Sequence, residues 1–389
     1  MNKRIHELNM TRGKPCKEQL DIASELLNSP LTEEDLLVDG VDARNYGLLG
    51  GISSAKKLIG EIADISPDKV TIFGNSSLEI MYELLSDSFV YGVDGSLPFH
   101  KQGKIKWLCP VPGYDRHFAM LEQFGVEMIN VNMNEDGPDM DEIERLIKDE
   151  SVKGIFVVPQ YSNPSGISFS NEVVRRFARL KPSAKDFRIY WDNAYIIHHL
   201  YNTKPILNII DECEKVGSLD MVYEFISTSK ITFAGGGIAA VISSKKNQEE
   251  ILKHLRYKTI GYDKINQVRH VKYLKDKSNI EKIMAKHASI IRPKFELVES
   301  IFEKELKGLA SWSEPQGGYF ITLYVKGIAK EVIAMCKERG VILTEAGCAF
   351  PYHLDPTNSV IRIAPTYPSL EELEEASKII CECVKSLTK

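Results

Sequence analysis

Short apolar runs alternate with helical patterns through the middle of the chain, and this alternation constrains the fold more than any other feature. Residues 154–159 form a continuous apolar run, and residues 188–191 and 222–226 are similar. Such runs are typical of parallel strands buried on both faces. Residues 76–85 and 116–124 carry the helical spacing that follows other short runs. The sequence therefore predicts an α/β fold with a mainly parallel sheet sandwiched by helices.

The chain of 389 residues is long enough for two domains. After Gly261 the pattern changes to a long helical stretch, residues 279–306, which we expect to be interrupted near Pro293. Shorter strands and helices follow and predict a smaller α/β domain. The expected strands of the large sheet are seven, at residues 70–73, 106–109, 127–131, 154–159, 188–191, 222–226 and 237–243. The expected parts are an N-terminal segment (1–50) packed on the small domain and on a partner subunit, a large domain (51–285) and a small domain (286–389).

Composition excludes several classes of function. The formal net charge is −5, which argues against a dedicated nucleic-acid surface. No stretch reaches the roughly 18 uncharged apolar residues of a membrane span. The N-terminal residues 1–7 carry charge without an apolar core behind it, unlike a secretory signal. The seven cysteines are scattered without a disulfide or metal-ligand spacing, which favours reduced thiols in a cytoplasmic protein.

Polar side chains follow the predicted strands at the points where they end. In parallel α/β sheets, ligands bind at the carboxyl ends of the strands, so these side chains should share one site. The residues concerned are Asn75 and Ser76, Asn163, Asp192, and then Ser227, Ser229 and Lys230.

This set suits pyridoxal phosphate, which needs a lysine amine for its aldehyde and a carboxylate to keep its ring nitrogen protonated. Lys230 fits the amine and Asp192 fits the carboxylate. Asn163 and Tyr195 are both candidates to bond the phenolic oxygen of the ring. Tyr114 is a candidate to stack on the ring.

The phosphate and the substrate require further groups. Ser76 and Ser77, at a predicted helix N-terminus, offer hydroxyls and free amides to a dianion, and Ser227 adds a hydroxyl. Arg362 lies inside an apolar strand, residues 360–364, and a buried guanidinium needs an anion. Taken alone, Arg362 fits a buried salt bridge as well as a clamp for a substrate α-carboxylate, and we favour the clamp beside Lys230 and Asp192.

With these motifs in this order, the chain resembles the fold-type I aminotransferases that depend on pyridoxal phosphate. More narrowly it resembles subgroup Ic of the bacterial aspartate aminotransferases, also labelled MocR-like or alanine–glyoxylate-type aminotransferase domains. The blocks that carry the resemblance are residues 11–15, 44–47, 74–77, 109–118, 161–166, 191–199, 227–235 and 361–366.

The resemblance implies a role for each matching residue. Lys230 would form the Schiff base and shuttle the proton, with Asp192 at the ring nitrogen and Tyr195 at the phenolic oxygen. Gly13 would belong to the segment that closes over substrate, and Tyr46 would reach the phosphate in the neighbouring subunit of a homodimer. The remaining implied contacts are Asn75, Ser76, Ser77, Tyr114, Asn163, Ser227 and Ser229 to the cofactor, and Asn163 and Arg362 to the substrate.

Two departures from the family pattern bear on the cofactor phosphate and on the substrate in turn. Ile238 stands where most aspartate aminotransferases carry a phosphate-binding arginine. No clear ligand for a distal carboxylate is found, although Lys258, Lys264 and Arg269 lie in the expected region. The expected activity is transfer of an amino group between an L-amino acid, favouring aspartate or glutamate, and a 2-oxo acid, without a metal.

Other functions remain open at this point. A monocarboxylate (alanine-type) aminotransferase, a β-lyase or a decarboxylase would use the same constellation. A ligand-sensing regulator would add a DNA-binding helix-turn-helix, for which family blocks that begin by residue 11 leave no room.

Overall fold

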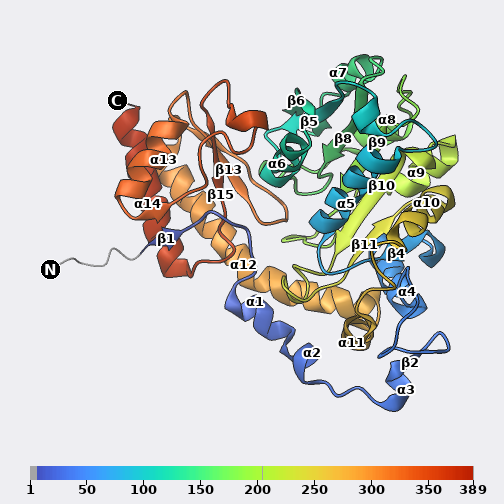
Figure 1. Ribbon diagram of the computed structural model, residues 1–389. Helices are drawn as coiled ribbons and strands as arrows, with labels where there is room; N and C mark the ends of the chain where they lie inside the picture. The colour runs from blue at the N-terminus through green and yellow to red at the C-terminus, as the bar shows by residue number, and fades with distance from the viewer. Residues whose placement is uncertain (1–6, 204, 389) are drawn as a thin grey trace.

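A computed structural model describes residues 7–203 and 205–388. Its main feature is a sheet with helices on both faces (Figure 1). The strands in spatial order are β4 (Val70–Ile72), β11 (Ala239–Ile242), β10 (Val222–Ser227), β9 (Arg188–Asp192), β8 (Val152–Val157), β5 (Lys106–Val111), β6 (Glu127–Asn134) and β7 (Gly137–Pro138). Strand β11 is antiparallel to both neighbours, and β7 is antiparallel to β6. The mainly parallel sheet is confirmed; β7 is a two-residue strand beyond the seven predicted.

Alternate side chains of the central strands pack into different cores. Ile189 belongs to the core beneath α4 (Ser53–Ala63) and α9 (Ile209–Val216), whereas Tyr190 belongs to the core beneath α5 (Ser77–Tyr91) and α10 (Lys245–Leu255). Both residues are fully buried, which explains the continuous apolar runs of the sequence. The helices around the sheet are α4 (Ser53–Ala63), α5 (Ser77–Tyr91), α6 (Asp115–Gln123), α7 (Met140–Leu146), α8 (Asn171–Ala178), α9 (Ile209–Val216), α10 (Lys245–Leu255) and α11 (Lys264–Leu274).

The C-terminal part is built on a small antiparallel sheet of β12 (Ser311–Trp312), β13 (Ile321–Tyr324) and β15 (Val360–Ile363). Helices α13 (Ala329–Glu338) and α14 (Leu370–Leu387) pack with it. Ser369 and Glu372 form a capping box at the start of α14. At the start of α5 only half of such a box is present, since Ser76 accepts from the Glu79 amide at 3.4 Å.

The N-terminal segment packs against the C-terminal part. Strand β1 (Leu8–Asn9) pairs in parallel with β14 (Val341–Ile342). The Gln19 side chain bonds His287 Nδ1 at 3.0 Å and the Tyr319 hydroxyl at 3.1 Å. The other elements of the segment are α1 (Lys17–Ile22), α2 (Ser24–Asn28), α3 (Glu33–Leu36), β2 (Leu37–Val38) and β3 (Val41–Asp42). The charged residues 1–6 lie outside the described part of the chain.

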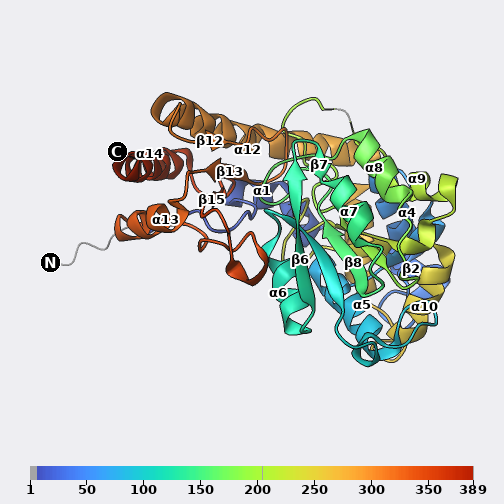
Figure 2. The ribbon, with the colours of Figure 1, turned by 90° about the horizontal axis from the view of Figure 1, so that it is seen from above.

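Helix α12 (Lys277–Leu306) joins the two parts, as Figures 1 and 2 both show. Met284 packs in the core beneath α4, and Phe295 and Phe302 pack in the core of the C-terminal part. The expected interruption near Pro293 is wrong, because the helix continues through the proline. Buried side chains of α12 before and after Pro293 offset the backbone hydrogen bond that the proline cannot donate. The predicted domain boundary near residue 285 falls inside this helix and stays a prediction.

Within the residues that the structure describes, no helix combines the length and the apolar character needed to cross a membrane.

Candidate active site

A cavity of about 270 Å³ lies at the carboxyl ends of the central strands, where Phe320 and Arg362 of the C-terminal part meet them. Apart from Asn75 and Tyr46, every residue predicted for the site lines this cavity. The predicted lining residues are Gly13, Ser76, Ser77, Tyr114, Asn163, Asp192, Tyr195, Ser227, Ser229, Lys230 and Arg362. The structure brings these residues together around one cavity, and their chemical roles stay predictions.

A tight turn after β10 presents Lys230 to the cavity. The Thr228 amide donates to the Ile238 carbonyl at 2.8 Å, and the Ile238 amide donates to Thr228 Oγ1 at 2.9 Å. A Cβ atom at Gly237 would lie 2.9 Å from Thr228 Oγ1 and 3.0 Å from the Ser229 amide nitrogen. Glycine is therefore required where the chain doubles back. Ile238 itself is a buried core side chain, so no charge replaces the missing arginine at that position.

The Lys230 amine lies 4.9 Å from the centre of the Tyr195 ring. Burial lowers the pKa of Lys230, and the nearby charge of Asp192 opposes that shift. Burial also raises the pKa of Tyr195 above its usual value and that of Tyr114 to about 12, so both phenols keep their protons at neutral pH. The cavity thus holds an amine that loses its proton more readily than a surface lysine, together with two phenols that remain neutral.

Asp192 ends β9 and is buried. Its Oδ2 lies 3.2 Å from His117 Nε2, and the His117 ring stacks on Phe156 with centroids 4.5 Å apart. Its Oδ1 makes no hydrogen bond within the described part of the chain. A buried carboxylate oxygen without a donor is costly, so this atom calls for an N–H from a bound group.

The sequence analysis did not predict His117 as a site residue, although His117 lies in the block 109–118 that carries the family resemblance. The available signal is its spacing from Tyr114. The two residues stand three apart at the start of α6, and their rings meet edge to face at 4.9 Å.

The contacts of Arg362 are compatible with both interpretations made from the sequence, a buried salt bridge and a clamp for a substrate carboxylate. Its Nη1 donates to Asp115 Oδ1 at 3.0 Å and makes a long contact of 3.5 Å with Asn163 Oδ1. Its Nη2 donates to the Thr11 carbonyl and to Thr344 Oγ1, both at 3.2 Å. The salt bridge is present, and the same guanidinium lines the cavity.

Three further charged residues line the cavity and were missed in the sequence: Arg12, Asp115 and Arg116. The three residues considered for a distal carboxylate do not line it. Lys258 pairs with Glu83, Lys264 donates to the Gly47 carbonyl at 3.1 Å, and Arg269 is exposed elsewhere on α11.

The phosphate-binding residues predicted in the sequence gather at the start of α5. Ser76 caps the helix and Ser77 is its first residue. Ser229 Oγ donates to the Asn75 carbonyl at 3.0 Å, which fixes Asn75 behind the cavity wall. Free amides at the start of a 15-residue helix attract an anion. Tyr46 is 77 % exposed and does not reach the cavity of its own chain.

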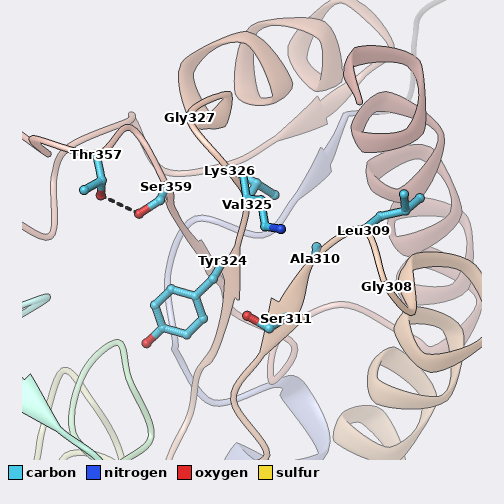
Figure 3. A pocket seen from close by; sticks show the side chains of 10 residues that line it. All are labelled: Gly308, Leu309, Ala310, Ser311, Tyr324, Val325, Lys326, Gly327, Thr357 and Ser359. Atoms are coloured by element: carbon cyan, nitrogen blue, oxygen red, sulfur yellow. Dashed lines mark hydrogen bonds between the residues drawn. The ribbon is translucent and has the colours of Figure 1, made fainter. Parts of the chain in front are cut away.

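A different hollow, of about 610 Å³, lies at the edge of the small sheet. Its lining is mostly backbone and small side chains, with Lys326 and a hydroxyl pair between Thr357 and Ser359 (Figure 3). It contains none of the predicted site residues.

The cavity with Lys230 fits pyridoxal phosphate on three counts. It holds a buried amine of lowered pKa, a buried carboxylate oxygen that lacks a donor, and hydroxyls at a helix N-terminus. These match the aldehyde, the ring nitrogen and the phosphate of the cofactor in turn.

Comparison with known proteins agrees with this fit. The family model described as "Aspartate amino-transferase" matches residues 1–389. An aspartate aminotransferase of Corynebacterium glutamicum is 42 % identical over 97 % of this chain and 89 % of its own length. The crystal structure of an aspartate transaminase from that organism has a TM-score of 0.95, with 42 % identity over 98 % of this chain and 91 % of the other.

A more distant structure shows the same fold. It is an α-aminoadipate aminotransferase from Thermus thermophilus, complexed with N-(5'-phosphopyridoxyl)-L-leucine, with a TM-score of 0.78 and 18 % identity over 98 % of this chain and 93 % of the other. With the family model and the C. glutamicum enzyme both matching nearly its whole length, this chain belongs to the aspartate aminotransferase family and is an aminotransferase.

Proposed function

We propose that this protein uses pyridoxal phosphate to move an amino group between a dicarboxylic L-amino acid and a 2-oxo acid. The observation that carries the proposal is the unpartnered Oδ1 of Asp192 in the cavity that Lys230 also lines. A protonated ring nitrogen would satisfy that oxygen, and the cofactor aldehyde would be met by the lysine. When bound, the cofactor withdraws electrons from the α-carbon of the amino acid.

Lys230 and Asp192 divide the work of proton transfer. The Lys230 amine would take the proton from the substrate α-carbon and deliver it to a different carbon, which requires a neutral amine. The lowered pKa of Lys230 supports this role. Asp192 is proposed to keep the ring nitrogen protonated, and His117 Nε2 lies 3.2 Å from the other oxygen of Asp192, where it limits the positions that the carboxylate can take.

Arg362 is proposed to bind the α-carboxylate through two parallel hydrogen bonds. Without substrate its Nη1 is held by Asp115. The substrate carboxylate therefore either displaces Asp115 or binds beside it. Tyr195 and Asn163 are proposed to bond the phenolic oxygen of the ring, with Tyr114 on its face. Gly13 allows the N-terminal segment to pass close to the site, since a Cβ there would lie 2.6 Å from Phe320 Cζ.

The preference for a dicarboxylic substrate is supported by the charges around the cavity. Arg12 and Arg116 line it and form no salt bridge with any described residue. A second substrate carboxylate would neutralise such a guanidinium. The names of the C. glutamicum relatives agree with this preference.

The assembly and location are also proposals. The high exposure of Tyr46 supports a homodimer in which each subunit lends this tyrosine to the phosphate site of the other. Seven buried cysteines without a disulfide support a cytoplasmic enzyme. The subgroup Ic assignment is supported by the sequence blocks alone.

A half-reaction screen tests the proposal. Single amino acids are added to the cofactor-loaded enzyme, and the change in its visible absorbance is followed together with the 2-oxo acid formed. Aspartate and glutamate should respond far faster than alanine. A response to alanine alone would assign a monocarboxylate enzyme, and ammonia with pyruvate from a β-substituted amino acid would assign a lyase.

A further inference from the structure

A larger cavity, of about 730 Å³, lies on the opposite side of β9 from the active site. Trp191 and Asn193 line it, whereas Asp192 between them lines the cofactor cavity. Among the residues that the structure describes, none lines both cavities. We call the larger one the rear cavity. The proposed transamination uses none of its residues.

The inner end of the rear cavity carries two buried acceptors. Glu224 of β10 is 2 % exposed and lies opposite Trp191 in the parallel pair of β10 and β9. Asn193 Nδ2 donates to Glu224 Oε1 at 2.7 Å. Glu224 Oε2 and Asn193 Oδ1 have no hydrogen-bond partner among residues 7–203 and 205–388. Two unpartnered oxygens at one place call for a group with more than one N–H.

The walls of the rear cavity are apolar. Aliphatic side chains come from α4, from the loop before α9 and from α12, and they include Ile62, Ile196, Ile206, Leu207, Ile280 and Met284. Such a lining accepts an apolar body of small-molecule size, with polar groups reserved for orientation.

The charges of the lining favour a cation. Four carboxylates line the cavity, Asp64, Asp211, Glu224 and Glu281, against the two full cations Lys277 and Arg292. Amino and oxo acid substrates carry carboxylates, so this cavity and the active site suit different ligands. Burial raises the pKa of Glu224 to about 7, so a bound cation would be paired by a carboxylate that ionises near neutrality.

We infer that the rear cavity is a second ligand site, for a small apolar cation whose N–H groups bond Glu224 Oε2 and Asn193 Oδ1. Aryl and alkyl amidinium or ammonium compounds form the class that fits. The amidinium is the closest match, because its planar pair of N–H donors serves two acceptors at once.

Benzamidine is a suitable probe, because it avoids the primary amines that react with the cofactor aldehyde. We expect calorimetric titration of the cofactor-loaded enzyme at pH 8 to give a dissociation constant on the order of 1 mM or below. Benzamide and benzoate, of the same shape but neutral or anionic, should bind at least about tenfold more weakly, since one charge-assisted hydrogen bond is lost.

Two variants locate the binding. Glu224→Gln keeps the shape and removes the charge, and it should weaken benzamidine about tenfold or more. Ala285→Phe places a ring at the exposed rim of the cavity and should abolish binding. Lys286→Phe, one residue further along α12 and outside the lining, should bind as the unmodified enzyme does.

Retained half-reaction rates would establish that both test variants are folded. Equal affinity of the unmodified enzyme, Glu224→Gln and Ala285→Phe for benzamidine would overturn the inference. So would the absence of measurable binding to the unmodified enzyme, or preference for benzoate. The proposed transamination is unaffected by any of these outcomes, since the titration contains no amino acid.

Discussion

Asp115 Oδ1 accepts a hydrogen bond of 3.0 Å from Arg362 Nη1, so an internal carboxylate holds the guanidinium that is proposed to bind the substrate. The Arg362 side chain is 5 % exposed and that of Asp115 is 29 % exposed. Water therefore reaches the Asp115 carboxylate but hardly reaches the Arg362 guanidinium, so it screens this ion pair only in part. An incoming α-carboxylate has to compete with this contact.

Replacement of Asp115 by Asn should ease that competition. We expect KM for the amino acid to fall about threefold to tenfold with little change in kcat, since a charged hydrogen bond is worth about 1.5–3 kcal/mol before screening. Steady-state kinetics would measure both constants. A rise in KM would instead mean that Asp115 orients Arg362 for binding.

Replacement of Lys230 by Ala should remove proton transfer at the α-carbon. We expect turnover to fall by about 10³-fold or more, together with the visible absorbance of the bound cofactor. Lys258→Ala is the matched control, because Lys258 pairs with Glu83 outside the cavity and should leave turnover unchanged. Substantial turnover in Lys230→Ala would contradict the assignment.

Replacement of Asp192 by Ala should preserve cofactor binding and lower kcat by about 10²- to 10⁴-fold, because the ring nitrogen loses its counter-charge. His117→Phe keeps the stack on Phe156 and removes the contact to Asp192 Oδ2. Its effect should be smaller and should appear as a shifted pH profile of kcat. An unchanged profile would assign His117 to packing alone.

Stability should depend on pH through Glu224. Burial raises the pKa of Glu224 in the folded state to about 7 from the ordinary glutamate value of 4.5, so between these pH values the folded state binds more protons and unfolding becomes easier as pH rises. Above pH 7 the burial costs about 3 kcal/mol. Glu224→Gln should therefore gain stability relative to the parent between pH 5 and pH 8. Denaturant unfolding of the variant and the parent at pH 5 and at pH 8 would measure the difference in their free energies of unfolding. An equal difference at the two pH values would exclude the effect.

Replacement of Tyr46 by Phe should weaken cofactor binding about tenfold or more, since a hydrogen bond to a charged phosphate is lost. Tyr257→Phe is the control, because Tyr257 is similarly exposed at 76 %. Cofactor titration of the two variants gives the comparison. Equal affinities would exclude Tyr46 from the phosphate site.

The large sheet was predictable because its strands are buried on both faces, and continuous apolar runs such as residues 154–159 signal that arrangement. The cavity followed from the same pattern, since Asn163, Asp192 and Lys230 come after neighbouring strands. These signals are local in sequence, and the sheet brings them together.

Contacts set by tertiary packing could not be predicted in this way. Asp115 and Arg362 are 247 residues apart, and nothing local to either residue announces their contact. The rear cavity likewise depends on α4, α9 and α12 meeting around Trp191. The course of α12 was mispredicted because a proline rule for isolated helices was applied to a helix buried on both sides of Pro293.

Helix α12 contributes side chains both to the core beneath α4 and to the core of the C-terminal part. It therefore constrains how the C-terminal part could move toward a bound substrate. The C-terminal part carries Arg362, so a movement of that part toward a bound carboxylate would displace one end of α12 relative to the other. Pro293 cannot donate an amide proton to the preceding turn, so we expect α12 to bend most easily there. A rotation of the C-terminal part about this position would change the distance between Arg362 and Lys230.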